Sequence, residues 1–108
     1  MSETRDNRIK EILRDLGARF LSDNGNGSSL LTVTRVELSG KGKYATIFFT
    51  VFPDSMEKTA LEFAKRKRSE FKAYVRENSK LGQIPMLDFE IDLGEKNRQK
   101  IDSLLNEK

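Results

Sequence analysis

The chain has 108 residues, of which 36% are hydrophobic and 34% charged, and its formal net charge is +3. It contains neither Cys nor His, which excludes thiol nucleophiles, imidazole bases, disulfides and the usual zinc and haem ligands. Its apolar runs are far shorter than the roughly 20 residues that span a bilayer, and the polar N-terminus has no secretory segment, so we expect a soluble, cytoplasmic protein without a membrane partner.

The length is typical of one domain, residues 1–108, and we expect residues 1–5 to be a flexible N-terminus. The first predicted element is an amphipathic helix over residues 6–21. Its apolar side chains recur every three or four positions, at Ile9, Ile12, Leu13, Leu16 and Phe20. Residues 23–29 contain two Gly and two Asn and predict a flexible connection.

Two strands are predicted next. In residues 31–38 the alternation of apolar and polar side chains changes phase, which predicts a β-bulge or a sharp twist near Thr34 and Arg35. Residues 44–52 are rich in aromatic and β-branched types on both faces, which is typical of a central strand. The Gly-Lys-Gly sequence within residues 39–42 predicts a hairpin turn between the two strands.

Residues 56–80 read as one long helix. Asp54 and Glu57, which follow the strand-ending Pro53, predict a capping box at its start. Lys67 falls in the apolar stripe of this helix. Either its side chain extends along the apolar surface to reach water, or the helix bends between Lys67 and Glu70, and we expect the bend.

The excess positive charge lies on this helix. Residues 55–80 hold eight basic and four acidic side chains, a net charge of +4, whereas residues 1–54 carry +1 and residues 81–108 carry −2, which together give +3. A localised basic surface indicates a polyanionic partner. The run Lys65-Arg66-Lys67-Arg68 also fits a short nuclear-import signal, a hypothesis that its position inside a helix disfavours.

The last predicted elements are a strand over residues 84–92 and a helix over residues 95–107, with Ile101, Leu104 and Leu105 facing inward. The outward face of the strand carries a row of carboxylates, Asp88, Glu90 and Asp92. Such a row either faces solvent or binds Mg²⁺, and we expect the solvated face. The order α-β-β-α-β-α predicts an α+β fold with a three-stranded sheet covered by helices on one face.

Three segments carry a resemblance to a known family. They are Arg5-x-x-Arg8-Ile9, then Val36-Glu37-Leu38-Ser39 followed by Tyr44-Ala45-Thr46-Ile47, and finally Pro85-x-Leu87-x-Phe89-x-x-Asp92 leading to Ile101 and Leu104. In this order and spacing they resemble the ribosome-binding factor A family of bacterial assembly factors. The resemblance implies a type II KH-like fold in which a helix–kink–helix replaces the Gly-x-x-Gly loop. Arg68-Ser69-Glu70 stands where the family usually has Ala-x-Gly, which suggests a divergent member.

The resemblance also implies a function. It implies a non-enzymatic, monomeric factor that binds the free or immature small ribosomal subunit and its rRNA and assists late maturation and rRNA processing, without a cofactor, metal or small-molecule substrate. The residues predicted to contact RNA are Arg5, Arg8, Lys41, Lys43, Lys65, Arg66, Arg68, Lys72, Arg76 and Lys80. Tyr44 and Phe48 are the aromatic residues that the strand pattern leaves available for stacking on bases. Two other classes stay open, a general KH-like nucleic-acid-binding module and a small α+β protein-interaction domain.

Overall fold

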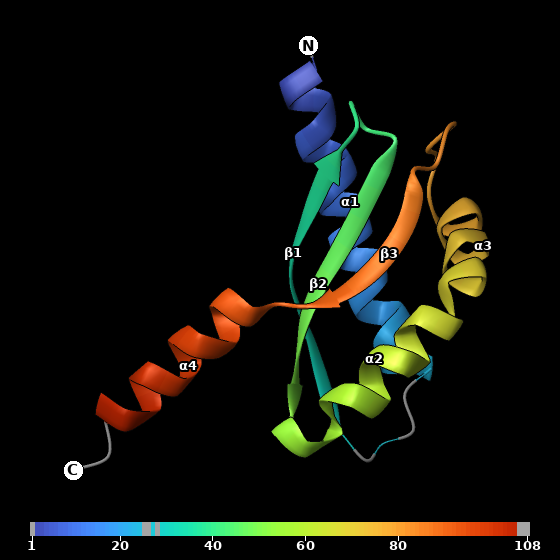
Figure 1. Ribbon diagram of the computed structural model, residues 1–108. Coiled ribbons are helices and arrows are strands. Elements are labelled where there is room, and N and C mark those ends of the chain that lie inside the picture. The colour runs from blue at the N-terminus through green and yellow to red at the C-terminus, as the bar shows by residue number, and fades with distance from the viewer. Residues whose placement is uncertain (1, 25–26, 28, 106–108) are drawn as a thin grey trace.

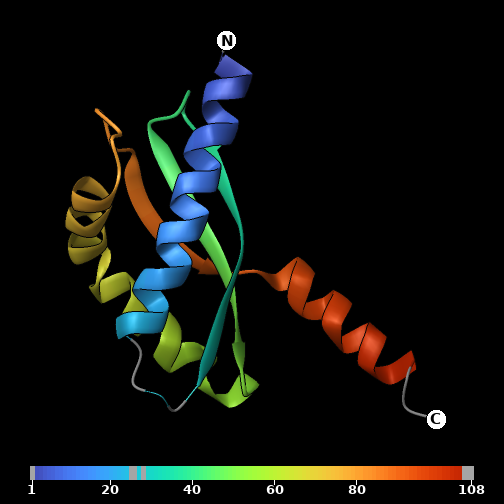
Figure 2. The same ribbon diagram turned by 180° about the vertical axis from the view of Figure 1, so that it is seen from behind.

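The computed structural model describes residues 2–24, 27 and 29–105. Helices α1, α2 and α3 cover one face of a three-stranded sheet, and α4 extends away from it (Figures 1 and 2). This arrangement confirms the predicted α+β class. The elements are α1 Ser2–Asn24, β1 Leu30–Ser39, β2 Tyr44–Phe52, the 3-10 helix Asp54–Met56, α2 Glu57–Arg66, α3 Arg68–Asn78, β3 Met86–Ile91 and α4 Leu93–Leu105.

The strands lie in the order β1-β2-β3, with β1 and β2 antiparallel and β2 and β3 parallel. The aromatic-rich β2 is therefore the central strand, as predicted. Val33 pairs with Phe49 and Arg35 pairs with Phe48, so Thr34 is an extra residue in β1 and forms a bulge. This bulge confirms the interpretation of the phase change in the sequence, and it turns the Thr34 side chain toward the start of α4.

The core lies between the sheet and the three covering helices, and aromatic rings connect its layers. The Phe71 ring of α3 lies 5.1 Å from the Phe20 ring of α1 and 5.2 Å from the Phe89 ring of β3, between ring centroids. Phe89 in turn meets Phe49 of β2 edge to face at 6.2 Å. Because aromatic rings bury large apolar areas, this series of contacts fixes α1 and α3 on the sheet.

The helical chain breaks at Lys67, where φ is −96° and ψ is 10°. The Lys67 N–H still donates to the Phe63 carbonyl at 3.2 Å, and its carbonyl accepts from the Phe71 N–H at 2.8 Å. The Lys67 ammonium lies 3.2 Å from the Glu70 carboxylate and 5.8 Å from the centroid of the Phe63 ring. The predicted bend is confirmed, because α2 ends at Arg66 and α3 begins at Arg68. Its physical reason is that a straight helix would have placed the Lys67 charge among apolar side chains.

Two local predictions at helix starts are wrong. Helix α1 begins at Ser2 rather than at residue 6, so residues 2–5 belong to the helix. The capping box is absent, because the residue that precedes α2 is Met56 and no side chain caps this end. The Glu57 carboxylate lies instead 3.0 Å from the Lys96 ammonium of α4, which draws it away from the backbone.

The prediction that the terminal helix packs inward is also wrong for Ile101, which is 56% exposed on α4, while the side chains of Leu104 and Leu105 lie outside the described residues. The position of α4 follows from Asp92, which we predicted to face solvent but which is only 3% exposed. Its carboxylate accepts the Glu95 N–H at 3.0 Å and thereby caps α4.

Candidate nucleic-acid interface

The N-terminal half of α1, the β1–β2 turn and the loop between α3 and β3 lie at the same end of the molecule (Figure 1). The turn has three successive residues with positive φ, Gly40 at 60°, Lys41 at 57° and Gly42 at 86°. The Gly42 N–H donates to the Ser39 carbonyl at 3.1 Å and closes the turn. The Met86 N–H donates to the Lys43 carbonyl at 2.9 Å, which holds the start of β3 beside the turn.

A cleft of about 770 Å³, which we call the turn cleft, opens between α1, the β1–β2 turn and the start of β3. Three of its lining side chains are basic, Arg5, Lys41 and Lys43, and Asp6 is acidic, so the lining carries a net charge of +2. The other lining residues are Ile9, Gly42, Tyr44, Gln83, Ile84, Pro85 and Met86. A concave basic surface with apolar walls concentrates its field on an anion within it.

A second cleft of about 650 Å³, the helix cleft, lies between α1 and residues 78–82. Its basic side chains are Arg5, Arg8, Arg19 and Lys80, and Asp15 is acidic, for a net charge of +3. The other lining residues are Ile9, Ile12, Leu16, Asn78, Ser79, Leu81 and Gly82. Arg5 and Ile9 line both clefts, so the two adjoin along α1.

Two further predicted cations lead toward the helix cleft along α3. Lys72 and Arg76 are exposed and one helical turn apart, and Lys80 follows shortly after α3 ends at Asn78. The Ser79 hydroxyl fixes this end, because it donates to the Val75 carbonyl at 2.8 Å and accepts the Leu81 N–H at 3.3 Å. The basic stripe predicted along a single helix is therefore divided at Lys67, and its second half ends at the helix cleft.

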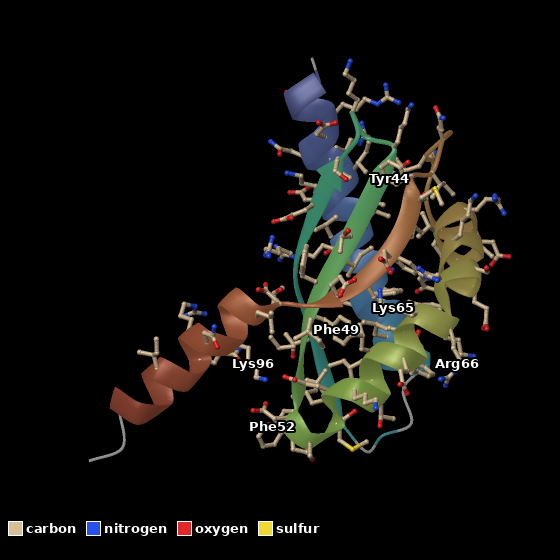
Figure 3. All side chains as sticks on the ribbon, in the orientation of Figure 1. Tyr44, Phe49, Phe52, Lys65, Arg66 and Lys96 are labelled. Carbon is tan, nitrogen blue, oxygen red and sulfur yellow. The ribbon has the colours of Figure 1, made fainter. Side chains whose placement is uncertain are left out.

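Two of the ten predicted contact residues are engaged within the protein. The Lys65 ammonium lies 3.0 Å from the Asp88 carboxylate and 2.9 Å from the Glu90 carboxylate, and Arg68 lies 3.3 Å from Asp88. Figure 3 shows Lys65 beside β3 and Arg66 on the outer side of the junction between α2 and α3. We predicted that the row of carboxylates on β3 would face solvent. Two of its three members, Asp88 and Glu90, instead form ion pairs with basic side chains of α2 and α3.

The electrostatics of this cluster favour its ionised form. Burial of the Asp88 carboxyl acts to raise its pKa, but hydrogen bonds from Lys65 and from the Phe89 N–H outweigh burial and hold the pKa below 3.8. Burial likewise acts to lower the pKa of Lys65, and its two carboxylate partners raise it above 10.5. Lys65 and Arg68 are consequently poorer candidates for phosphate contact than the sequence suggested.

The other predicted contact residues, unlike Lys65 and Arg68, are not paired with carboxylates of the described residues. Within the described part of the chain, eight of the ten form no ion pair: Arg5, Arg8, Lys41, Lys43, Arg66, Lys72, Arg76 and Lys80. Five of these eight line the two clefts, and Arg66 lies apart at the break between the helices. The structure therefore brings together cations from α1, the turn and the α3–β3 loop that are remote in the sequence.

Arg19 also lines the helix cleft but was not among the predicted contact residues. A signal for it exists in the sequence. Arg5, Arg8, Ile12, Asp15 and Arg19 are spaced by three and four positions, which places them on one face of α1. Asp15, which lies between Arg8 and Arg19 in this row, makes the basic face discontinuous.

The two aromatic candidates for stacking differ in exposure. Tyr44 is 49% exposed at the wall of the turn cleft. Phe48 is only partly exposed, and the Arg35 guanidinium lies 3.9 Å from the centroid of its ring. Because a cation already covers the Phe48 ring, Tyr44 alone of the two remains accessible at this end of the molecule.

Among the described residues there is neither a candidate metal site nor a candidate membrane-spanning helix. No group of three or more acidic side chains among them is arranged to hold a metal ion. None of the helices, over the same residues, is long and apolar enough to cross a membrane.

Known proteins supply an independent comparison. The family model for ribosome-binding factor A matches residues 2–105. The chain belongs to the ribosome-binding factor A family. The ribosome-binding factor A of Kosmotoga olearia is 28% identical over 103 residues, which cover 94% of this chain and 82% of that protein. The ribosome-binding factor A of Beutenbergia cavernae is 36% identical, with 93% of this chain and 62% of that protein covered.

The fold of this chain is also similar to that of a solved structure from the same family. The crystal structure of ribosome-binding factor A from Thermus thermophilus superimposes with a TM-score of 0.68 at 22% sequence identity. The match covers 79% of this chain and 93% of that one. At this identity the likeness concerns the fold, and it agrees with the α+β arrangement of three strands and covering helices.

Proposed function

We propose that this protein binds the free or immature small ribosomal subunit through its rRNA and assists late maturation and rRNA processing. In this proposal it acts as a monomer in the cytoplasm and performs no catalysis itself. Membership of the ribosome-binding factor A family supports a ribosomal partner.

The observation that carries the proposal is the gathering around the two clefts of cations that form no ion pair with a described residue. Cations from three segments, α1, the β1–β2 turn and the α3–β3 loop, line two adjoining clefts that contain few acidic residues. These cations are Arg5, Arg8, Lys41, Lys43 and Lys80. Cations that pair within a protein are already neutralised, whereas unpaired ones release counterions from a phosphate backbone when they bind it. Contacts of this kind position a protein on RNA without reading its sequence.

The arrangement also suggests a path for the RNA. The path begins at Arg66, follows Lys72 and Arg76 along α3 to Lys80, and crosses the helix cleft to the turn cleft. Such a path suits a folded RNA surface, because it extends over several elements rather than a single helix.

Sucrose-gradient cosedimentation tests the proposal directly. The protein, mixed with free small subunits, with complete ribosomes and with unrelated single-stranded RNA, should sediment mainly with the free small subunits. Equal association with all three would instead indicate a general KH-like nucleic-acid-binding module. Binding to a partner that persists after nuclease treatment would indicate a protein-interaction domain and contradict the proposal.

A further inference from the structure

The turn cleft differs from the helix cleft because an exposed aromatic residue, Tyr44, is among its lining residues. Tyr44 is 49% exposed, and Met86, its cross-strand partner in β3, is 68% exposed. Lys41 and Lys43 precede Tyr44 closely in the chain, and Arg5 of α1 lines the same cleft. An exposed ring among cations is the combination by which proteins bind single-stranded nucleic acids, since the ring stacks on a base while the cations contact its phosphates.

The Tyr44 ring is held in place by the turn. A Cβ atom on Gly40 would lie 2.8 Å from Cδ2 and 2.9 Å from Cε2 of Tyr44, so the ring rests directly against the glycine backbone. Gly40 has a φ of 60°, which the turn requires. A ring fixed in this way loses little freedom when a base stacks on it, and this preorganisation favours binding.

The size of the cleft fits the same ligand. At about 770 Å³ it falls within the range of about 300 to 1,000 Å³ that is usual for small-molecule sites. Ile84 and Pro85 add apolar residues to the lining, and Gln83 offers an amide that can donate to and accept from a base edge. Asp6 is the one acidic lining residue, and it leaves a net positive charge.

We propose that the turn cleft binds an unpaired nucleotide of the RNA, with its base stacked on Tyr44 and its phosphates held by Lys41, Lys43 and Arg5. This inference rests on the proposed RNA-binding function and adds to it the chemistry of one contact. A base inside a duplex is stacked on its neighbours and cannot reach the ring, so the site selects unpaired RNA.

Substitution of Tyr44 tests the proposal with a short oligouridylate and with an RNA duplex of equal phosphate number, both followed by fluorescence anisotropy. Tyr44→Leu should weaken oligouridylate binding about tenfold and leave duplex binding unchanged. Tyr44→Phe should retain binding, because it keeps the ring. An unchanged oligouridylate affinity for Tyr44→Leu, or an equal loss with both probes, overturns the stacking site.

Two glycine variants provide a matched control. Gly40→Ala and Gly27→Ala both place a Cβ on a residue of positive φ, but a Cβ on Gly27 meets nothing within 4 Å and Gly27 lines neither cleft. Gly40→Ala should displace the Tyr44 ring and reproduce the loss seen with Tyr44→Leu, whereas Gly27→Ala should not. Equal effects of the two alanine variants on oligouridylate binding contradict a role for the ring position.

Charge reversal outside the turn cleft separates failure of the stacking site from failure of the proposed function. Reversal of Lys72 and Arg76 to Glu should weaken binding of both probes, because these exposed residues lie outside the turn cleft and their proposed contacts are with phosphates, which both probes carry. If that double variant binds both probes as the wild type does, the RNA-binding proposal itself is wrong. If it weakens both and Tyr44→Leu weakens neither, only the stacking site is wrong.

Discussion

Lys65 and Arg66 are neighbours in the sequence with opposite surroundings. The Lys65 ammonium lies between the carboxylates of Asp88 and Glu90, at 3.0 and 2.9 Å. Arg66 is exposed and forms no ion pair with a described residue. At this scale a count of basic residues overstates the charge available to a partner, because β3 neutralises part of it.

Charge reversal at these two positions should therefore separate stability from binding. Lys65→Glu places a third carboxylate beside Asp88 and Glu90, and we expect it to lower the free energy of unfolding by about 1 kcal/mol. Arg66→Glu should lower that free energy by only about 0.3 kcal/mol, through loss of a favourable charge at the C-terminus of α2, and should weaken binding to small subunits. Urea unfolding and cosedimentation measure the two effects. The assignment fails if Arg66→Glu destabilises the protein as much as Lys65→Glu does, or if Lys65→Glu is as stable as the wild type.

Asp92 shows how one buried carboxylate fixes a whole element. It accepts hydrogen bonds from the Thr34 hydroxyl at the β1 bulge and from the Glu95 N–H, and it pairs with Arg35 at 3.2 Å. Burial of the Asp92 carboxyl acts to raise its pKa, but these partners outweigh burial and hold the pKa below 3.8. Asp92 thus joins β1, the end of β3 and α4.

This geometry gives a prediction for acid pH. The unfolded chain takes up a proton on Asp92 near the ordinary pKa of 3.8, before the folded protein does, so the stabilisation is present above that pH and declines as pH falls through the lower folded pKa. Asp92→Asn should cost about 1 to 2 kcal/mol near neutral pH and show a shallower acid decline.

Urea unfolding over a pH series measures both effects. Asp15→Asn, a change at an exposed site on α1, serves as the control and should follow the wild type. A parallel acid decline in Asp92→Asn and the wild type would show that Asp92 carries none of this pH dependence.

At the scale of helices and strands, the sequence predicted the elements whose signals are local. The phase change at Thr34 indicated the bulge, the Gly-Lys-Gly sequence indicated the turn, and Lys67 in an apolar stripe indicated the break between α2 and α3. Each of these features depends on residues close together in the chain, and each is present in the structure.

The sequence did not predict features that depend on contacts between residues far apart in the chain. The Asp54–Glu57 capping box fails because Glu57 binds Lys96 of α4, 39 positions along the chain. Asp92 was predicted to face solvent because strand alternation says nothing of Thr34 and Arg35 on another strand. The pairing of Lys65 with β3 was not predicted for the same reason, because a count of basic residues along the chain does not show which of them pair with carboxylates on another element.

On the scale of the whole molecule, the eight predicted contact residues that form no ion pair with a described residue extend over one end and one side of the fold. The covering helices leave the clefts open between α1, the turn and the α3–β3 loop, while α4 projects in another direction (Figure 2). We therefore expect these cations to contact rRNA phosphates and basic residues elsewhere on the surface not to do so.

The salt dependence of small-subunit binding tests this expectation with two variants of equal charge. Lys72, Arg76 and Lys80 are reversed to Glu in one, and Lys10, Arg14 and Lys58, which line neither cleft, in the other. Each set of three reversals changes the net charge by −6, from +3 to −3. Both variants thus lose the same non-specific attraction to RNA.

The measured quantity is the slope of the logarithm of the association constant against the logarithm of salt concentration. The first variant should bind more weakly with a slope shallower by about 2 to 3, because each lost phosphate contact reduces the slope by about 0.7 to 0.9. The second should keep the wild-type slope. Equal slopes for the two variants would contradict the proposed interface, because net charge rather than this surface would then govern binding.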